Sequence, residues 1–245
     1  MAWQTPKTDW RAADGVSNND MNRIEGNIAY INGQIPSLPS AEYTIYVNGD
    51  TGSDSTGNGT QLAPFKTIMK AVNTASKLGN GCNVNINISP TTYNEDVTIK
   101  HFANTVTILG STSAATIKSL YVADATLMVH IPLITTEAIG VVVEHGGNLF
   151  MTSSLTCRNA SSFGIYTLYN GIATFDSAVE FTNCAIGIHA TQHSRLYANS
   201  IRGSVTAYGI VAASGSVVSY GAYNATGGAR VLTNNGGRVV TGAQS

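Results

Sequence analysis

The chain has 245 residues, of which 43% are hydrophobic. This share is enough to build a core and argues against a disordered protein. The 13 basic and 14 acidic side chains leave a net charge of −1 at pH 7, so neither nucleic acid nor an acidic membrane surface is an expected partner. No apolar run is long enough to cross a bilayer and no export signal is visible, so we expect no membrane insertion.

The three cysteines, Cys82, Cys157 and Cys184, are widely spaced and odd in number. Such a set fits neither a disulfide framework nor the ligand spacing of a zinc site. We expect buried free thiols in a chain that folds in a reducing cytoplasm, with no metal site and no cofactor.

Residues 1–40 form the first predicted domain, a polar segment followed by a helix. Ser17 is a suitable N-cap, and Asp20 lies in the first turn, where the helix dipole favours an acid. The apolar residues behind this cap are Met21, Ile24, Ile28, Ile31 and Ile35. Their alternating steps of three and four residues form a heptad seam, and isoleucine at both seam positions favours trimers or tetramers. The alternative is a short amphipathic helix packed on its own domain or on a neighbour.

Residues 41–82 form the second predicted domain, which caps the third. A strand at residues 43–47 leads into a polar loop, in which Asp50, Asp54 and Asn58 are interpreted as a turn rather than as a calcium site. A helix then begins after Pro64 and is expected to end near Gly79. An amphipathic helix in this place would cover the open end of a stack of strands.

Residues 83–245 form the third predicted domain, a solenoid of strands. Apolar residues first alternate with polar ones, and a short motif centred on glycine then returns at Gly140, Gly164, Gly187 and Gly209. These glycines lie 24, 23 and 22 residues apart. A fixed period of this size with β-branched residues indicates one coil per repeat, and about seven coils in all.

Several columns of the repeat are predicted to face the core. They are Leu149, Ala173, Leu196 and Val218; Met151, Phe175, Ala198 and Tyr220; Leu155, Val179, Ile201 and Tyr223; and Ile139, Phe163, Ile186 and Tyr208. An outer column is formed by Val142, Tyr166, His189 and Val211. We predict that this outer column packs around the threefold axis of a homotrimer. A chance run of residues that suit a strand and a platform for sugar are the alternatives.

The stretch Tyr46-Val47-Asn48-Gly49-Asp50 with Gly52-Ser53-Asp54, Gly57 and Pro64-Phe65-Lys66-Thr67-Ile68-x-Lys70-Ala71-Val72 resembles the N-terminal capping segment of right-handed parallel β-helix proteins. The pectate-lyase-like group, which includes phage tailspikes, carries this pattern. Residues 84–99 are similar to the first coil of that group, except that Thr92 stands where the group usually has glycine. The resemblance implies an all-β fold, a right-handed parallel β-helix with an N-terminal capping helix.

The stretch Trp10-x-x-x-Asp14-x-Val16-Ser17-x-x-Asp20-Met21-Asn22-Arg23-Ile24-Glu25-x-Asn27-Ile28 resembles the N-termini of tail-fibre and baseplate proteins of phages of Gram-positive bacteria. The resemblance implies that residues 1–40 anchor the chain to other tail or baseplate proteins, often in trimers. It also implies a protein of the virion tail, which is assembled in the host cytoplasm and acts outside the cell.

Carboxylates are poorly placed for catalysis within one chain. Asp176 and Glu180 could share a strand face, but four residues of strand put them about 13 Å apart, which is more than the spacing a glycosidase uses. After Glu180 the chain has no acidic residue. We expect no enzyme, although a site formed between subunits with Asp176 or Glu180 stays open.

Tyr197 is predicted to face outward, and the last part of the chain is basic. We therefore expect Tyr197, Arg195 and Arg202 to contact a host-surface polysaccharide or teichoic acid. The resulting expectation is a receptor-facing structural tail protein. The alternatives are a polysaccharide-degrading tailspike with an intersubunit site and a purely architectural baseplate component.

Overall fold

The computed structural model describes residues 4–8, 11, 14–34, 42–78 and 82–241. The chain divides into two compact units, Met1–Leu38 and Pro39–Ser245. The predicted capping segment and the predicted solenoid therefore belong to one unit, and the predicted helix of residues 1–40 belongs to the other.

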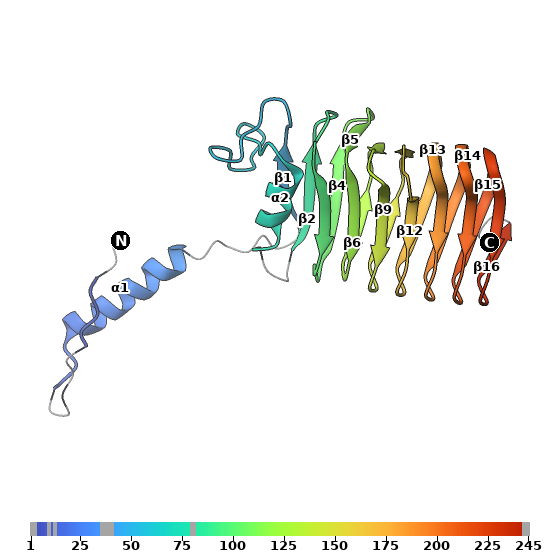
Figure 1. The fold of residues 1–245 in the computed structure, drawn as a ribbon. Helices are drawn as coiled ribbons and strands as arrows, with labels where there is room; N and C mark the ends of the chain where they lie inside the picture. The colour runs from blue at the N-terminus through green and yellow to red at the C-terminus, as the bar shows by residue number, and fades with distance from the viewer. Residues whose placement is uncertain (1–3, 9–10, 12–13, 35–41, 79–81, 242–245) are drawn as a thin grey trace. The chain divides into compact units, whose positions relative to one another are not determined.

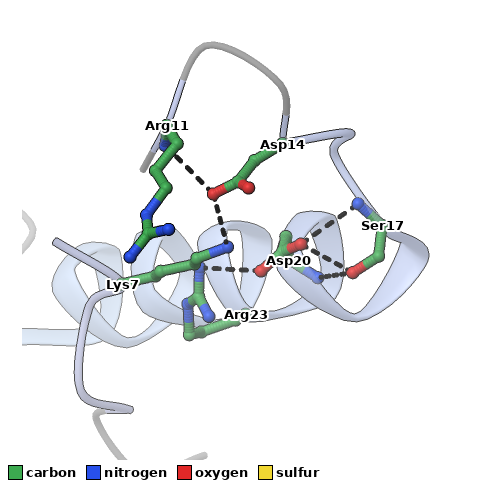
Figure 2. Close-up of polar contacts among 6 residues, drawn as sticks. All are labelled: Lys7, Arg11, Asp14, Ser17, Asp20 and Arg23. Carbon is green, nitrogen blue, oxygen red and sulfur yellow. Dashed lines mark hydrogen bonds and ion pairs between the residues drawn. The ribbon is translucent and has the colours of Figure 1, made fainter. Parts of the chain in front are cut away.

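The first unit contains helix α1 (Asn18–Gln34). Ser17 caps it as predicted, because its Oγ accepts the backbone N–H of Asp20 at 3.2 Å. The Asp20 carboxylate in turn accepts the backbone N–H and the hydroxyl of Ser17, at 3.1 and 2.6 Å (Figure 2). These reciprocal bonds satisfy backbone donors that the start of a helix leaves open. They also hold the pKa of the Asp20 carboxyl below its usual value.

The segment before α1 folds back along the helix. The side-chain amide of Asn27 accepts the backbone N–H of Gln4 and donates to its carbonyl, both at 2.8 Å. Asp14 forms an ion pair with Lys7 at 3.3 Å and accepts the backbone N–H of Arg11 at 3.0 Å (Figure 2). One side of α1 is thereby covered by its own chain.

The apolar row of α1 lies open to solvent in the single chain. The side chains of Met21, Ile24 and Ile28 are 46%, 43% and 53% exposed. Ile31 belongs to the helix, but its side chain and all of Ile35 lie outside the described residues. The seam is therefore present and exposed over its first two turns among the described residues, and association along it stays a prediction.

The second unit is a parallel β-helix of about seven turns, as predicted (Figure 1). Its elements in chain order are β1 (Glu42–Val47), α2 (Ile68–Ala75), β2 (Asn83–Ile88), β3 (Asp96–Lys100), β4 (Thr105–Gly110), β5 (Ala115–Ile117), β6 (Ser119–Ala123), β7 (Thr126–Val129), β8 (Leu133–Thr135), β9 (Ile139–Glu144), β10 (Asn148–Met151), β11 (Leu155–Arg158), β12 (Phe163–Thr167), β13 (Ile172–Ala190), β14 (Arg195–Ala212), β15 (Val217–Thr233) and β16 (Arg238–Thr241).

Three parallel runs of strands make the faces of the coil. The first runs β1-β2-β4-β7-β10, the second β3-β6-β9-β12 and the third β5-β8-β11. All three runs join β13. β13, β14 and β15 are each a single long, bent strand that passes through most of one coil. The coils of β13, β14 and β15 are therefore hydrogen-bonded to one another along most of their length.

Most predicted core columns face inward. Met151, Phe175, Ala198 and Tyr220 lie opposite one another on successive coils and are all buried. Leu155, Val179 and Ile201 are buried in the same way, with Tyr223 half-buried at the end of their column. Stacking each apolar side chain on its own counterpart removes both from water, which is the main stabilising term in such a fold.

One predicted core column is wrong. Its members Ile139, Phe163, Ile186 and Tyr208 are half-exposed, while the glycine after each of them is buried. Other side chains occupy the space beside these glycines: the Phe181 ring lies where side chains of Gly164 and Gly187 would be, and the Tyr223 ring lies beside Gly209. The chain bends at these glycines so that glycine and the next residue both face the core, and the preceding apolar residue turns outward.

The last coil is less covered than the others. β16 pairs only with residues 217–220 of β15, so residues 221–233 have one hydrogen-bonded neighbour strand among the described residues. The guanidinium of Arg230 donates to the Tyr220 hydroxyl at 2.8 Å and lies 4.8 Å from the centre of the Tyr223 ring. Arg230 thus covers part of the core at this end through a cation–π contact.

The other end is covered by α2. Its residues Ile68, Ala71, Val72 and Ala75 are buried as predicted, but it ends at Ala75, before the predicted end at Gly79, which lies outside the described residues. The Glu95 carboxylate accepts the backbone N–H groups of Ile68 and Met69 at 2.7 and 3.0 Å. This acid on the first coil therefore holds the start of the capping helix in place.

Asp54 fixes the loop before α2. Its carboxylate accepts the backbone N–H of Lys66 and both the N–H and the hydroxyl of Thr67, at 2.8, 3.1 and 2.7 Å. Burial acts to raise the pKa of the Asp54 carboxyl, but these hydrogen bonds outweigh it and lower the pKa below the usual value. The loop that contains Asp50, Asp54 and Asn58 is thus held by hydrogen bonds within the protein.

We predict that Gly164→Ala will lower the free energy of unfolding by about 1–3 kcal/mol, because the new methyl group overlaps the Phe181 ring. The cost should fall by at least about 0.5 kcal/mol when Phe181→Leu is also present, since the two positions then no longer compete for the same space. Urea unfolding of both single variants and the double variant measures this coupling. Additive costs would contradict the proposed contact.

We predict that Asp54→Asn will weaken folding at pH 7 by about 1 kcal/mol. Because the pKa of Asp54 is lower in the folded protein than its usual value of 3.8, its contribution to the free energy of unfolding is complete above pH 3.8. This contribution is lost as the pH falls through the lower pKa of the folded protein. The stability difference between the two proteins should therefore shrink below this pH. Urea unfolding at a series of pH values measures this stability difference. Asp50→Asn is the control, because among the described residues the Asp50 carboxylate accepts a hydrogen bond only from the Thr91 hydroxyl. The backbone N–H of Asp50 donates to the Asn48 side chain, so the substitution leaves that bond in place.

Candidate functional site

A groove opens on the outer face of β13, β14 and β15. It has a volume of about 480 Å³ and contains Arg195 and Tyr197, two of the residues predicted to contact glycan. The residues that line it are Ile172, Ala173, Thr174, Arg195, Leu196, Tyr197, Val217 and Ser219. We call it the Arg195–Tyr197 groove.

Strand alternation places the outward side chains of this groove. Arg195 and Tyr197 are two residues apart on β14, so both face away from the core, while Leu196 between them is buried. Ile172 and Val217 lie on either side of Arg195, and Thr174 and Ser219 lie on either side of Tyr197. The groove therefore combines an aromatic ring, two hydroxyls, two aliphatic side chains and a guanidinium.

The charge of the groove is entirely positive. None of its lining residues is acidic, and Arg238 on β16 continues the row of Ile172, Arg195 and Val217 by one coil. Within the part of the chain that the structure describes, neither Arg195 nor Arg238 forms an ion pair. Both guanidinium groups are exposed and available to a ligand.

Arg202, the third predicted glycan contact, does not join the groove. It lies opposite Glu180 on the neighbouring coil, and its Nε is 3.2 Å from the Glu180 carboxylate. An exposed pair of this kind contributes at most about 1 kcal/mol. Its consequence here is that the charge of Arg202 is matched within the protein.

The structure gives no carboxylate pair at Asp176 and Glu180. A register shift between Phe175 and Ala178 separates them, and the Glu180 carboxylate is bound by Arg202. Asp176 is exposed, and its backbone carbonyl accepts the side-chain amide of Asn199 at 3.0 Å. These two acids offer no shared site within this chain.

The outer column is in register, since Val142, Tyr166, His189 and Val211 lie opposite one another on successive coils. Tyr166 and His189 stack with ring centres 5.1 Å apart, and Phe163 contacts both rings. Burial lowers the pKa of the His189 imidazole. Val211 differs from the prediction, because it is only 5% exposed between His189 and Leu232 of the adjacent coils.

A cluster that sequence reasoning missed surrounds Glu144. The Tyr121 hydroxyl donates to the Glu144 carboxylate, and His145 Nδ1 lies 3.0 Å from the same oxygen. The hydrogen bond to Glu144 is the main cause that raises the pKa of Tyr121 to about 12. The His145 ring stacks on Tyr169 at 4.8 Å. We call these four residues the Glu144 cluster.

The Glu144 cluster arises from a diagonal contact. Tyr121 lies directly opposite Val142, and Glu144 lies two residues later on the same outer face. A search for partners one full period apart pairs Glu144 with Leu168 instead and overlooks this neighbour. Diagonal pairs on adjacent strands are within reach of long side chains, and this rule could have found the cluster.

Among the described residues, no group of three or more His, Cys, Asp and Glu side chains could hold a metal ion. The described helices include none that is both long and apolar enough to span a bilayer. Comparison of the chain with protein-family models, with curated proteins and with solved structures gave no match.

Proposed function

We propose that this chain is a receptor-facing structural protein of a bacteriophage tail, which binds a host-surface glycopolymer in the Arg195–Tyr197 groove without cleaving it. The observation that carries the proposal is the groove itself, in which Arg195 and Tyr197 face outward together over about 480 Å³. The resemblances of residues 43–110 to β-helical tailspikes and of residues 10–28 to tail anchors supply the biological setting.

The chemistry of the groove suits a sugar chain. The Tyr197 ring offers an apolar face for the C–H side of a sugar ring, while Thr174 and Ser219 offer hydroxyls to its polar edge. The groove is open and crosses three parallel strands, so a polymer can pass through it without a free end. No pair of acids lies in it, and this supports binding without hydrolysis.

The Glu144 cluster favours a second candidate, a polysaccharide-degrading protein. A carboxylate that contacts both a tyrosine hydroxyl and an imidazole has the groups needed for proton transfer. None of its four residues lines the Arg195–Tyr197 groove, and His145 and Tyr169 are exposed. A substrate would therefore meet the cluster on an open surface, which makes this the weaker candidate.

The proposed assembly is a homotrimer joined through α1, with residues 1–40 bound to other tail or baseplate proteins. Its support is the row of Met21, Ile24 and Ile28, which stays exposed although Asn27 of the same helix is bonded to Gln4 of the N-terminal segment. Three such rows can bury one another in a short coiled coil. The proposed localisation of this assembly is the virion tail.

We predict a stable trimer for the full chain, measured by light scattering at micromolar concentration. Changing Ile24 and Ile28 together to Asn places polar amides in the apolar seam and should weaken association by several kcal/mol, on the order of 2–3 per buried amide. The control changes Asn19 and Asn22, which are exposed outside the seam, to Ala. A monomeric wild-type protein would contradict the assembly.

We predict binding to a subset of glycans on an array and to purified cell walls of Gram-positive bacteria, with no release of reducing or unsaturated ends. Tyr197→Ala should weaken binding by about tenfold, because the stacking surface is lost. Tyr46→Ala is the matched control, since Tyr46 is a half-buried outward tyrosine on β1. Cleavage of any polymer that Glu144→Gln abolishes would move the second candidate to first place.

A further inference from the structure

We infer that the ligand of the Arg195–Tyr197 groove is a polyanion whose negative groups bind Arg195 and Arg238. The inference rests on the proposed function and specifies the class of its ligand. It goes beyond that function because a neutral polysaccharide would fill the same groove. Three observations support it: the position of the two arginines, their lack of partners among the described residues and the absence of acidic residues from the groove lining.

Arg195 and Arg238 occupy one row on the outer face. Arg195 lies opposite Val217, and Val217 lies opposite Arg238, so the two arginines are two coils apart. Adjacent strands are spaced about 4.8 Å, which puts the two backbone positions about 10 Å apart. Val217 separates them with a short apolar side chain. One flexible polymer can therefore contact both guanidinium groups while it crosses the groove.

The four arginines of the last coils fall into two kinds. Arg202 is paired with Glu180, and Arg230 is bonded to Tyr220 and stacked on Tyr223. Arg195 and Arg238 have no hydrogen bond or ion pair of their side chains within the described residues. The two unpaired arginines are therefore the two that border the groove, and the two that lie elsewhere are used within the fold.

The lining of the groove carries no negative side chain, and the exposed Asp176 lies two residues beyond Thr174 on β13. The chain has no Asp or Glu after residue 180, so β14, β15 and β16 present no negative side chain at all. The two positive charges lie about one Debye length apart at physiological salt, so both act on the same segment of ligand. Repulsion between two exposed charges is weak at this separation, so the pair costs the free protein little.

Guanidinium groups favour particular anions. Their planar fork donates two parallel hydrogen bonds to the oxygens of a phosphate or a carboxylate, which a sugar hydroxyl cannot match. Phosphodiester and uronate polymers share this chemistry. The tyrosine and the hydroxyl groups of the groove then contact the neutral parts of each repeat.

The test compares three defined probes with the full chain: poly(glycerol phosphate), polygalacturonate and neutral dextran. We expect at least one polyanion to bind and dextran to bind at least about tenfold more weakly, because hydrogen bonds to charged groups are lost. Affinity for the polyanion should fall as NaCl is raised from about 50 to 300 mM, since salt screens exposed charges. The two polyanions together identify which anionic group is preferred.

Variants locate the contacts. Arg195→Ala and Arg238→Ala should each weaken polyanion binding by about tenfold, and Arg195→Lys should restore only part of the loss. Arg158→Ala, an exposed arginine on β11 outside the groove, is the matched control and should leave binding unchanged. All of these side chains are exposed, so melting temperatures should stay close to that of the wild type.

Three results would overturn the inference. The first is failure to bind either polyanion, and the second is binding of dextran as tightly as the polyanions and independently of salt. Equal losses of polyanion affinity for Arg158→Ala and Arg195→Ala would also contradict the contact assigned to Arg195. The cell-wall binding test decides the proposed function separately, because a neutral glycan bound through Tyr197 would satisfy that function and not this inference.

Discussion

Each residue of the β-helix faces its own counterpart about 4.8 Å away on the next coil, and this constraint shapes the whole second unit. An apolar side chain repeated at this spacing buries itself on its copy, as Met151 and Phe175 do. A repeated charge would face a like charge at the same distance. The low share of charged residues, 11%, is a consequence of this geometry.

Several of the charges that do occur are matched across coils or bound to the backbone. Glu180 has Arg202 one coil away, Asp54 binds the loop before α2, and Glu95 binds the start of that helix. Arg195 and Arg238 at the groove are not matched in this way among the described residues. Their cost to the free protein is small because both are exposed, and they leave donors that only an external group can use.

The sequence predicted the period, the strands and most of the buried columns, because a two-residue alternation carried on a fixed repeat determines which side chains stack. It failed where the backbone bends. At Gly164 and Gly187 two consecutive residues face the core, so the alternation reverses and Phe163 moves outside. Strand alternation contains no signal for such a bend, whose cause is a bulky ring, Phe181, from a different part of the coil.

The candidate site was predictable only in part, for a related reason. Tyr197 was predictable from the outward alternation of one strand, and Arg195 from the basic composition of the last part of the chain. Arg202 obeys it too, but its pairing with Glu180 depends on which acid the next coil places opposite. The Glu144 cluster depends on a diagonal neighbour, and Val211 on the cover that Leu232 provides. These are contacts between coils, which the repeat of a single coil does not specify.

The sparsely covered last coil has a consequence for how the molecule opens. In a solenoid each coil is held mainly by its neighbours, so local unfolding is easiest where one neighbour is missing. Among the described strands β16 has only β15 beside it and pairs along four residues, Val217–Tyr220. Backbone amides should therefore exchange with solvent fastest at this end and progressively more slowly toward β2. A molecule that holds Arg238 and Arg195 at once would fasten the last coil to the two before it, and its binding would be visible as slower amide exchange in β15 and β16.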